Sequence, residues 1–401
     1  MNQLVAGEAG LRVEVIRNPA AWDDLEPEYD ELFEASPTAS PPLHRDWLRS
    51  WWRIYAGRDA GLRVVTVRRG GGLVGALPLY LRGGGVSTLG VGVRRLGFLS
   101  TGEPRAESTW AEYLDLLHAP GEADACLDQA LAALRGSEAG RWDVLEFRDI
   151  AASSPLLRWR GLREAGLRAS ASSRGESPVA DLSGGFESYL GRLSPGTRQQ
   201  ARRLLRAVET EGLSLELAAT PDEADRYFDQ LVELHQARWA EAGRPGCFAS
   251  RRFSEFHRTL SRLWVPEGRA VLARLARDGV PVAVLYGFPN RAKFDFYQSG
   301  VVLAGTGRLR SPGVAAHLAL MQYLASRGIE AYDFLRGASE YKARLATDSI
   351  PLARLRVTRP GVRSAADGMG EWAIGLARSM IRDRSVPAHG SRPGRGGTAG
   401  E

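Results

Sequence analysis

The feature that most constrains this chain is an order of elements that occurs twice. In each half, two strand-like segments flank a glycine-bearing turn, and a helix and an aspartate-bearing strand follow. The turn glycines Gly72 and Gly279 are 207 residues apart, and the strand aspartates Asp143 and Asp333 are 190 apart. Similar spacings indicate a duplicated α/β unit of ordinary domain size. We therefore expect an α/β (α+β) protein of two tandem domains, each a mixed, mostly antiparallel sheet flanked by helices.

Apolar periodicity predicts the elements inside each domain. Helical spacing of apolar side chains predicts helices over 43–56, 123–135, 156–166, 195–212, 221–242 and 312–327. Runs of apolar and β-branched residues predict strands or strand hairpins over 62–69, 73–81, 142–147, 269–289, 292–299 and 331–335.

Local composition divides the chain into four segments. The stretch 167–180 (LRASASSRGESPVA) has a Ser/Gly/Pro composition, which is typical of a connection between domains. Residues 368–384 carry an amphipathic pattern that predicts packing on the domain or peripheral contact with a membrane or partner. The last residues are rich in Gly, Pro, Ser and Arg and are predicted to be disordered. We expect an N-terminal domain, a C-terminal domain, an amphipathic helix and a disordered tail, over 1–172, 173–362, 363–385 and 386–401.

Composition excludes several classes of protein. Hydrophobic residues make up 44% and charged residues 25% of the chain, which is typical of a soluble globular protein. No apolar run approaches the ~20 residues of a membrane span, and the N-terminus does not have the pattern of a signal peptide, so we expect a cytoplasmic location. Cys126 and Cys247 lie in different halves without metal-type spacing, and the histidines show none either. We therefore expect no disulfide and no metal.

The charge is unusually composed. The formal net charge is +6, and 51 of the 53 basic residues are arginine because only Lys293 and Lys342 are lysines. A high-GC genome explains such a composition, but guanidinium groups also bind phosphates bidentately. The two lysines are singled out by their rarity.

The sharpest local motif is Arg308-Leu309-Arg310-Ser311-Pro312-Gly313, which leads from a strand into the helix predicted at 312–327. A helix N-terminus has unpaired backbone N–H groups and the positive end of the helix dipole. Proline is favourable in the first turn, and the two arginines add positive charge. The motif predicts either a phosphate-binding site or an ordinary helix cap.

The order of three strands, this R-x-x-S-x-G loop, a helix and a strand resembles the GNAT superfamily. In that fold the loop is typically [QR]-x-x-G-x-[GA] and its amides bind the CoA pyrophosphate, whereas this chain has Ser311 at the first glycine. A closer resemblance is to the CelD-type acetyltransferases associated with cellulose and exopolysaccharide loci, which have two GNAT-like halves. It covers roughly 20–360 and rests on spaced motifs: His44 to Trp52, Leu77-Pro78-Leu79, Thr197 to Arg203, His235-x-x-Arg238-Trp239 with Gly243 and Phe248, Ser311-Pro312-Gly313, and Tyr332 to Gly337 with Tyr341-Lys342.

The resemblance implies an acyltransferase that moves an acyl group from acetyl-CoA or another acyl-CoA to an amine or hydroxyl of a small molecule or saccharide precursor by direct attack. It implies a donor site at Arg308, Arg310, Ser311, Pro312, Gly313 and Val314. Two alternatives stay open. Fem-type enzymes share the double-GNAT fold but take amino acids from aminoacyl-tRNA, and the arginine content suits tRNA. The second alternative is a non-catalytic binding or assembly factor whose site has lost its activity.

Acyl transfer to an amine also needs a base and an acid for the leaving thiolate. Asp333 ends a strand beside the core helix, where it is either a substrate-side group or a structural carboxylate paired with Arg336. Asp295 and Tyr297 alternate with two phenylalanines, so both point to the opposite face of their strand. Tyr297 is therefore either a general acid or a packing residue.

Substrate-binding candidates flank these groups. His235 and Trp239 are four residues apart on one helix face, where they line an acceptor pocket or pack in the core. A lysine on the loop after the Asp333 strand suits an anionic group. We assign substrate binding to His235, Arg238, Trp239, Arg336, Tyr341 and Lys342.

Two features are set aside. Cys247 is not assigned as a nucleophile, because the sequence assures it no histidine partner and the resemblance requires no covalent intermediate. In the first half, Glu122 precedes the helix at 123–135 and would repel a pyrophosphate. We expect that half to be a degenerate domain that supplies structure and one wall of the acceptor site.

Overall fold

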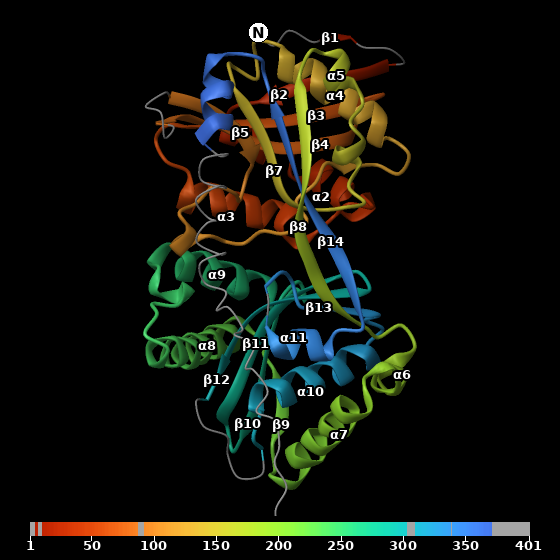
Figure 1. Ribbon diagram of the computed structural model, residues 1–401, viewed down its shortest axis with the longest axis vertical. Helices are drawn as coiled ribbons and strands as arrows, with labels where there is room; N and C mark the ends of the chain where they lie inside the picture. Colours follow the sequence, from red (N-terminus) through yellow and green to blue (C-terminus); the bar gives the residue numbers. More distant parts are fainter. Residues whose placement is uncertain (1–4, 7–9, 87–91, 303–308, 338, 371–401) are drawn as a thin grey trace, which may run out of the picture.

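The computed structural model describes residues 5–6, 10–86, 92–302, 309–337 and 339–370. Their strands form one sheet of fourteen, in the order β1-β2-β3-β4-β5-β7-β14-β8-β13-β12-β11-β10-β9, with β6 beside β4 (Figure 1). The strands are β1 (Val5–Ala6), β2 (Leu11–Ile16), β3 (Ala60–Arg69), β4 (Gly72–Val86), β5 (Gly92–Phe98), β6 (Leu117–His118), β7 (Val144–Ala151), β8 (Arg168–Asp181), β9 (Ser214–Leu217), β10 (Val271–Arg277), β11 (Val280–Asn290), β12 (Lys293–Val301), β13 (Ala331–Asp333) and β14 (Asp348–Thr358).

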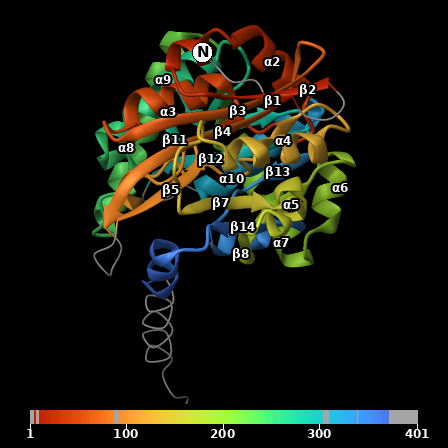
Figure 2. The ribbon, with the colours of Figure 1, turned by 90° about the horizontal axis from the view of Figure 1, so that it is seen from above.

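Helices cover both faces of this sheet. They are α1 (Pro19–Asp23), α2 (Glu26–Ala35), α3 (Arg45–Tyr55), α4 (Ala123–Arg135), α5 (Gly161–Glu164), α6 (Gly185–Arg192), α7 (Pro195–Thr210), α8 (Pro221–Glu241), α9 (Arg251–Trp264), α10 (Pro312–Ser326) and α11 (Glu340–Leu345). In the C-terminal half, α6, α7 and α10 pack on one face, and α8 and α9 pack on the other. Seen from above, α8 and α9 lie on the same side as α3 of the first half (Figure 2).

The pairing pattern confirms two tandem units of one kind. In the first unit, β3, β4 and β5 are antiparallel neighbours, α4 follows, and β7 pairs parallel to β5. In the second unit, β10, β11 and β12 are antiparallel neighbours, α10 follows, and β13 pairs parallel to β12. Both parallel ladders are three residues long, after which the strands separate.

The registers of these ladders correct the expected correspondence between Asp143 of the first unit and Asp333 of the second. The last pair of the second ladder joins Asp295 to Asp333, and that of the first joins Gly97 to Glu146. The counterpart of Asp333 is therefore Glu146 and not Asp143, which lies just before β7.

The stretch 167–180 is not a loose connection, because β8 occupies it. From Arg168 to Val179, β8 pairs with β14, and its last residues, Val179 to Asp181, pair with β13. β14 in turn leaves the second unit and pairs with β7 of the first. Each unit thus ends in a strand that pairs with the other unit, and β8 and β14 run side by side between them (Figure 1). The small polar residues reflect a strand whose first part is mostly exposed, and the boundary expected at 172–173 falls inside it.

One hydrophobic core cluster spans both units. Trp47 and Trp51 of α3 are buried, and Trp47 packs edge-on against Phe256 of α9, with 5.1 Å between ring centroids. This confirms the helix predicted over 43–56. A second cluster lies under α6, α7 and α10.

The helix predicted over 156–166 is wrong as one element. A short 3₁₀ helix covers Pro155–Arg158, and α5 begins anew at Gly161. A Cβ at Gly161 would lie 2.9 Å from Leu131 of α4, so the chain passes close to α4 at this point.

The segments predicted over 368–384 and 386–401 lie outside the described residues from 371 onward, and residues 362–370 are helical. None of the helices in the described ranges combines the length and hydrophobicity that a membrane crossing requires.

Candidate functional site

A pocket of about 310 Å³ opens at the N-terminus of α10. We call it the α10 pocket, and its walls come from α8, from β12 and the residue after it, from α10 and from α11. The lining residues are Arg238, Glu241, Ser299, Val301, Val302, Ser311, Pro312, Gly313, Val314, His317 and Tyr341. A much smaller pocket shares Val314 and Tyr341 with it and lies between α7, α10 and α11. The two together form a groove past the start of α10.

Among the described residues, nothing accepts a hydrogen bond from the first backbone amides of α10. Ser311 is the N-cap residue, and its side chain makes no capping hydrogen bond. The first helical bond runs from Ala315 N to Ser311 O, so the N–H groups of Gly313 and Val314 precede the intrahelical pattern. A Cβ at Gly313 would lie 3.1 Å from Val301 Cγ2, so this glycine lets α10 pack closely against β12. The pocket can bind an anion through these amides and the dipole of α10.

The inner wall of the α10 pocket is aromatic and neutral. His317 Nδ1 lies 2.8 Å from the Tyr332 hydroxyl, and the His317 ring stacks on Tyr341 with 5.2 Å between centroids. Burial, assisted by the nearby Lys342 ammonium, lowers the pKa of His317 to about 3. The imidazole is therefore uncharged at neutral pH, and Arg238 supplies positive charge at the rim.

The structure brings part of the predicted site together here. Ser311, Pro312, Gly313 and Val314 line the pocket, as do two predicted substrate-binding residues, Arg238 and Tyr341. Arg310 is exposed on the approach to α10. Arg308 lies outside the described residues.

Asp333 and Asp295 lie elsewhere, in a buried network around Lys293. Asp333 is fully buried and accepts hydrogen bonds from Lys293 Nζ (3.1 Å) and from three further donors: Tyr113 Oη (2.7 Å), Ser177 Oγ (2.5 Å) and Leu335 N (2.8 Å). Lys293 Nζ also pairs with Asp295 Oδ1 at 2.6 Å and lies 4.0 Å from the centre of the Tyr113 ring.

Charge balance holds this network together. Burial raises the pKa of Asp295 to about 6, against the opposing effect of Lys293. For Lys293, burial opposes the ammonium form, but the two carboxylates outweigh it and raise its pKa. The partner of Asp333 is therefore Lys293 and not the expected Arg336. The left-handed Leu335 (φ 54°) turns the chain, and Arg336 pairs instead with Glu112 and Asp149 of the first unit.

Tyr297 is also separated from the α10 pocket. Its hydroxyl donates to the carbonyl of Thr109 (2.5 Å) and lies 2.8 Å from His257 Nε2. It packs against the core cluster that spans both units, on the face opposite α10, as the alternation with the phenylalanines predicted. Burial raises the pKa of Tyr297, which favours a structural hydroxyl over a proton donor.

The remaining predicted residues support local structure. Lys342 Nζ donates to the carbonyls of Phe334 (2.7 Å) and Leu335 (3.2 Å), so both lysines of the chain secure the end of β13. His235 is buried on α8 with the Trp239 ring 5.8 Å away. His235 Nε2 lies 3.5 Å from the Sγ of Cys247, so the structure supplies the histidine partner that the sequence could not assure.

The segment between β5 and β6 also contributes to this region, although no local sequence pattern indicates it. Both Glu112 carboxylate oxygens accept from Arg336 N, at 2.9 and 3.2 Å, and burial raises the pKa of Glu112 to about 8. Nearby, several non-glycine residues have left-handed backbone angles, a conformation that is concentrated at functional and strained sites. They are Ser100, Trp110, Tyr113, Asp149 and Leu335. Neither tryptophan, tyrosine nor leucine signals this conformation in a sequence.

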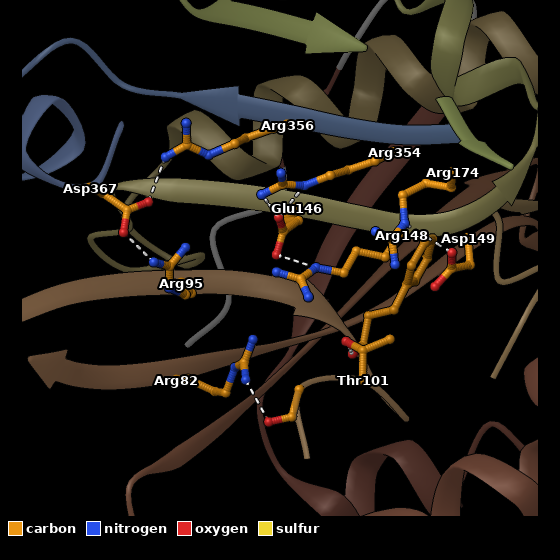
Figure 3. Close-up of polar contacts among 12 residues, drawn as sticks. Arg82, Arg95, Thr101, Glu146, Arg148, Asp149, Arg174, Arg354, Arg356 and Asp367 are labelled. Atoms are coloured by element: carbon orange, nitrogen blue, oxygen red, sulfur yellow. Dashed lines mark hydrogen bonds and ion pairs between the residues drawn. The ribbon is translucent and has the colours of Figure 1, made fainter. Parts of the chain in front are cut away.

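The first unit has a different arrangement at the equivalent position. Glu146, the counterpart of Asp333, accepts from Arg148 Nε (2.7 Å) and Arg354 Nε (2.5 Å) (Figure 3). Asp367 is likewise shared by two arginines, Arg95 and Arg356 (Figure 3). Ahead of α4, Glu122 is paired with Arg69 at 2.8 Å, where the second unit has uncapped amides. A carboxylate at this helix start disfavours an anion.

Among the described residues, no group of three or more His, Cys, Asp or Glu side chains is arranged to hold a metal ion.

Comparison with known proteins agrees with this geometry. Residues 195–343, which include the start of α10, match the acetyltransferase (GNAT) domain family. The crystal structure of FemX is 12% identical, covering 84% of this chain and 96% of that one with a TM-score of 0.55. The C-terminal domain (DUF2156) of an Agrobacterium fabrum protein described as a lysylphosphatidylglycerol synthetase is 15% identical, covering 88% and 97%, with a TM-score of 0.51. No curated protein matches. The second unit is thus similar to a GNAT acetyltransferase domain, and most of the chain shares its fold with these two structures.

Proposed function

We propose that this protein is an acyl-CoA-dependent N-acyltransferase whose second unit binds the donor at the α10 pocket. The observation that carries the proposal is the uncapped start of α10, which opens into a pocket within the region that matches the GNAT family. Acetyl-CoA is the donor that we expect.

In the donor complex, the N–H groups of Gly313 and Val314 would bind pyrophosphate oxygens, with Arg238 and Arg310 adding positive charge. The neutral His317 and Tyr341 rings would contact the less polar part of the donor. The pocket lies along the part of β12 that no longer pairs with β13. We expect the thioester of the donor to extend along this part of β12.

The acceptor would approach from the side where the first unit meets the end of β13. There Glu112 contacts Arg336, and the exposed Trp110 ring lies beneath the Arg336 guanidinium. We propose direct attack by an amine of a small molecule or a saccharide precursor, and the CelD-type resemblance favours a role in exopolysaccharide synthesis.

Turnover tests this proposal. The purified protein is incubated with acetyl-CoA and a panel of primary amines and amino sugars, and release of the free CoA thiol is followed. In a parallel reaction, an aminoacyl-tRNA mixture replaces acetyl-CoA. Release of CoA that depends on an amine supports the proposal. Transfer from aminoacyl-tRNA alone would contradict it and favour a Fem-like donor, and no transfer from either would favour a binding or assembly factor.

A pair of variants ties turnover to the α10 pocket. Ser311→Asp places a residue that suits the N-cap position, but with a carboxylate where the pyrophosphate would bind, so KM for acetyl-CoA should rise at least about tenfold. Thr220→Asp is the matched control, because Thr220 also caps a helix ahead of a proline but at the far end of α8. Its KM should not change.

A further inference from the structure

Cys247 and His235 form a close pair in the second unit. Cys247 begins the short 3₁₀ helix Cys247–Ala249 in the loop between α8 and α9, and its Sγ lies 3.5 Å from His235 Nε2. The cysteine is partly exposed, whereas His235 is only 3% exposed. A partly buried thiol therefore lies next to a buried imidazole, which is the pairing of a nucleophile with a base.

A third side chain sets the tautomer of His235. His235 Nδ1 lies 3.0 Å from Gln236 Oε1, and Gln236 Nε2 donates to the carbonyl of Pro245 at 2.7 Å. The second bond fixes which end of the amide faces the histidine. Because an amide oxygen only accepts, Nδ1 carries the hydrogen and Nε2 directs its lone pair at the Cys247 thiol.

The surrounding chain holds the imidazole in place. Phe248 packs edge-on against it with 4.9 Å between ring centroids, and Trp239 lies on another side. Gly246 has a left-handed φ of 66°, and a Cβ there would collide with Gln236 Oε1 and lie 3.1 Å from His235 Cε1. The glycine is therefore required for the loop to close over the Gln236–His235 pair.

We propose that Cys247 and His235 form a nucleophile–base pair that accepts an acyl group from a thioester. In this step the Cys247 sulfur attacks the thioester carbonyl carbon while His235 Nε2 takes the thiol proton. The carbon–sulfur bond to the donor breaks, the donor thiolate leaves with that proton, and a new thioester forms at Cys247. The inference goes beyond the direct transfer proposed above, because it makes the protein itself an acyl acceptor.

The resting pair is uncharged. Burial lowers the pKa of His235 to about 4 and raises the pKa of Cys247 to about 12, so the thiol proton moves only during the attack. The other titratable and charged groups near the pair are Arg238 of α8, Tyr297 of β12 and Tyr55 of α3. Burial raises the pKa of both phenols, so neither titrates between pH 6 and 8.

The chain contains its own control. Cys126 is completely buried, and its Sγ contacts the carbonyl of Val74 at 3.4 Å rather than a histidine. If the reaction of Cys247 depends on proton removal by His235, the same reagent should leave Cys126 unmodified.

The test uses the acetyl thioester of N-acetylcysteamine, a small donor with no nucleotide. Acetylation at each cysteine is measured by peptide mass spectrometry after acid quenching. We expect rapid acetylation of Cys247, none at Cys126, and a loss of at least about 100-fold in His235→Asn. Because this probe needs no pyrophosphate site, its result is independent of whether acetyl-CoA binds the α10 pocket.

The wild-type pH profile keeps the test valid even if His235→Asn does not fold. A thiol assisted by a neutral imidazole should react at a nearly constant rate between pH 6 and 8. An unassisted thiol, with a pKa of about 8.5, should react about tenfold faster per pH unit over this range. Failure of Cys247 to acetylate, or a tenfold rise per unit, would overturn the proposal.

Discussion

At the scale of single residues, rarity was the signal that led to the two lysines, but it did not reveal their roles. Lys342 was expected to bind substrate, and Lys293 was given no role. In the fold both secure the end of β13, Lys293 through Asp333 and Lys342 through two carbonyls. The partners of Asp333 include Tyr113, 220 residues away in the sequence, so local pattern could not predict this network.

Removing the Lys293 ammonium should destabilise the protein strongly. Lys293→Met would leave Asp295 and Asp333 buried without their shared counter-charge, which typically costs about 3–5 kcal/mol. Lys342→Met removes donors from two carbonyls only and should cost about 1–3 kcal/mol. Urea denaturation measures both, and a cost for Lys293→Met below that for Lys342→Met would refute this account of the network.

Glu112 should make stability depend on pH. Burial raises its pKa from 4.5 to about 8, so between these values the folded protein holds a proton that the unfolded chain releases. The wild-type free energy of unfolding should therefore fall as pH rises from about 5 to 8. Glu112→Gln should lose this part of the dependence, so its stability relative to wild type should increase across that window. Exposed Glu233→Gln on α8 is the control, and parallel pH curves for wild type and Glu112→Gln would contradict the assignment.

At the scale of elements, prediction succeeded where one periodicity ran unbroken. The helix expected over 312–327 is α10, and the strand expected over 292–299 is β12. At 167–180 the composition predicts a connection between domains, but these small polar residues form the strand β8. Backbone pairing with β14 does not depend on their side chains. The motif at Ser311 was found because a helix start is a local feature. The His235–Cys247 contact depends on how the loop between α8 and α9 closes, and the local sequence does not predict it.

The position of β14 predicts an unusual effect of one leucine. Leu355 is 4% exposed and packs in the core cluster shared with the first unit, although it is near the end of the sequence. Leu355→Ala should cost about 2–5 kcal/mol and increase hydrogen exchange in β7. Leu324→Ala on α10 is the control, since Leu324 is also 4% exposed but lies in the other cluster. If the Leu355→Ala protein showed faster hydrogen exchange in α10 but not in β7, this would contradict the packing of β14 against the first unit.

At the scale of the whole molecule, duplication could be read from the sequence, but the exchange of strands could not. The pairing of β14 with β7 joins residues about 200 positions apart, and no local pattern encodes it. The division at 172–173 stays a prediction, and the structure argues against two independent folding units. Because β8 of the first unit pairs with β13 and β14 of the second, and β14 of the second pairs with β7 of the first, neither unit keeps its sheet intact when the other unfolds.

Calorimetry tests this coupling. We expect one thermal transition in which the calorimetric and van't Hoff enthalpies agree, as for a single cooperative unit. Destabilising the first unit by Leu355→Ala should shift that transition to lower temperature without splitting it. Two resolved transitions would show that the units unfold separately.

The central claim is that the start of α10 binds the donor pyrophosphate, and titration calorimetry with acetyl-CoA tests it most directly. Wild type and Thr220→Asp should bind with the same affinity. Ser311→Asp should bind at least about tenfold more weakly while its melting temperature stays the same or rises, because aspartate suits an N-cap position and the positive end of the helix dipole. Equal binding by all three proteins would place the donor elsewhere, and no binding by a folded wild type would contradict the acyl-CoA assignment itself.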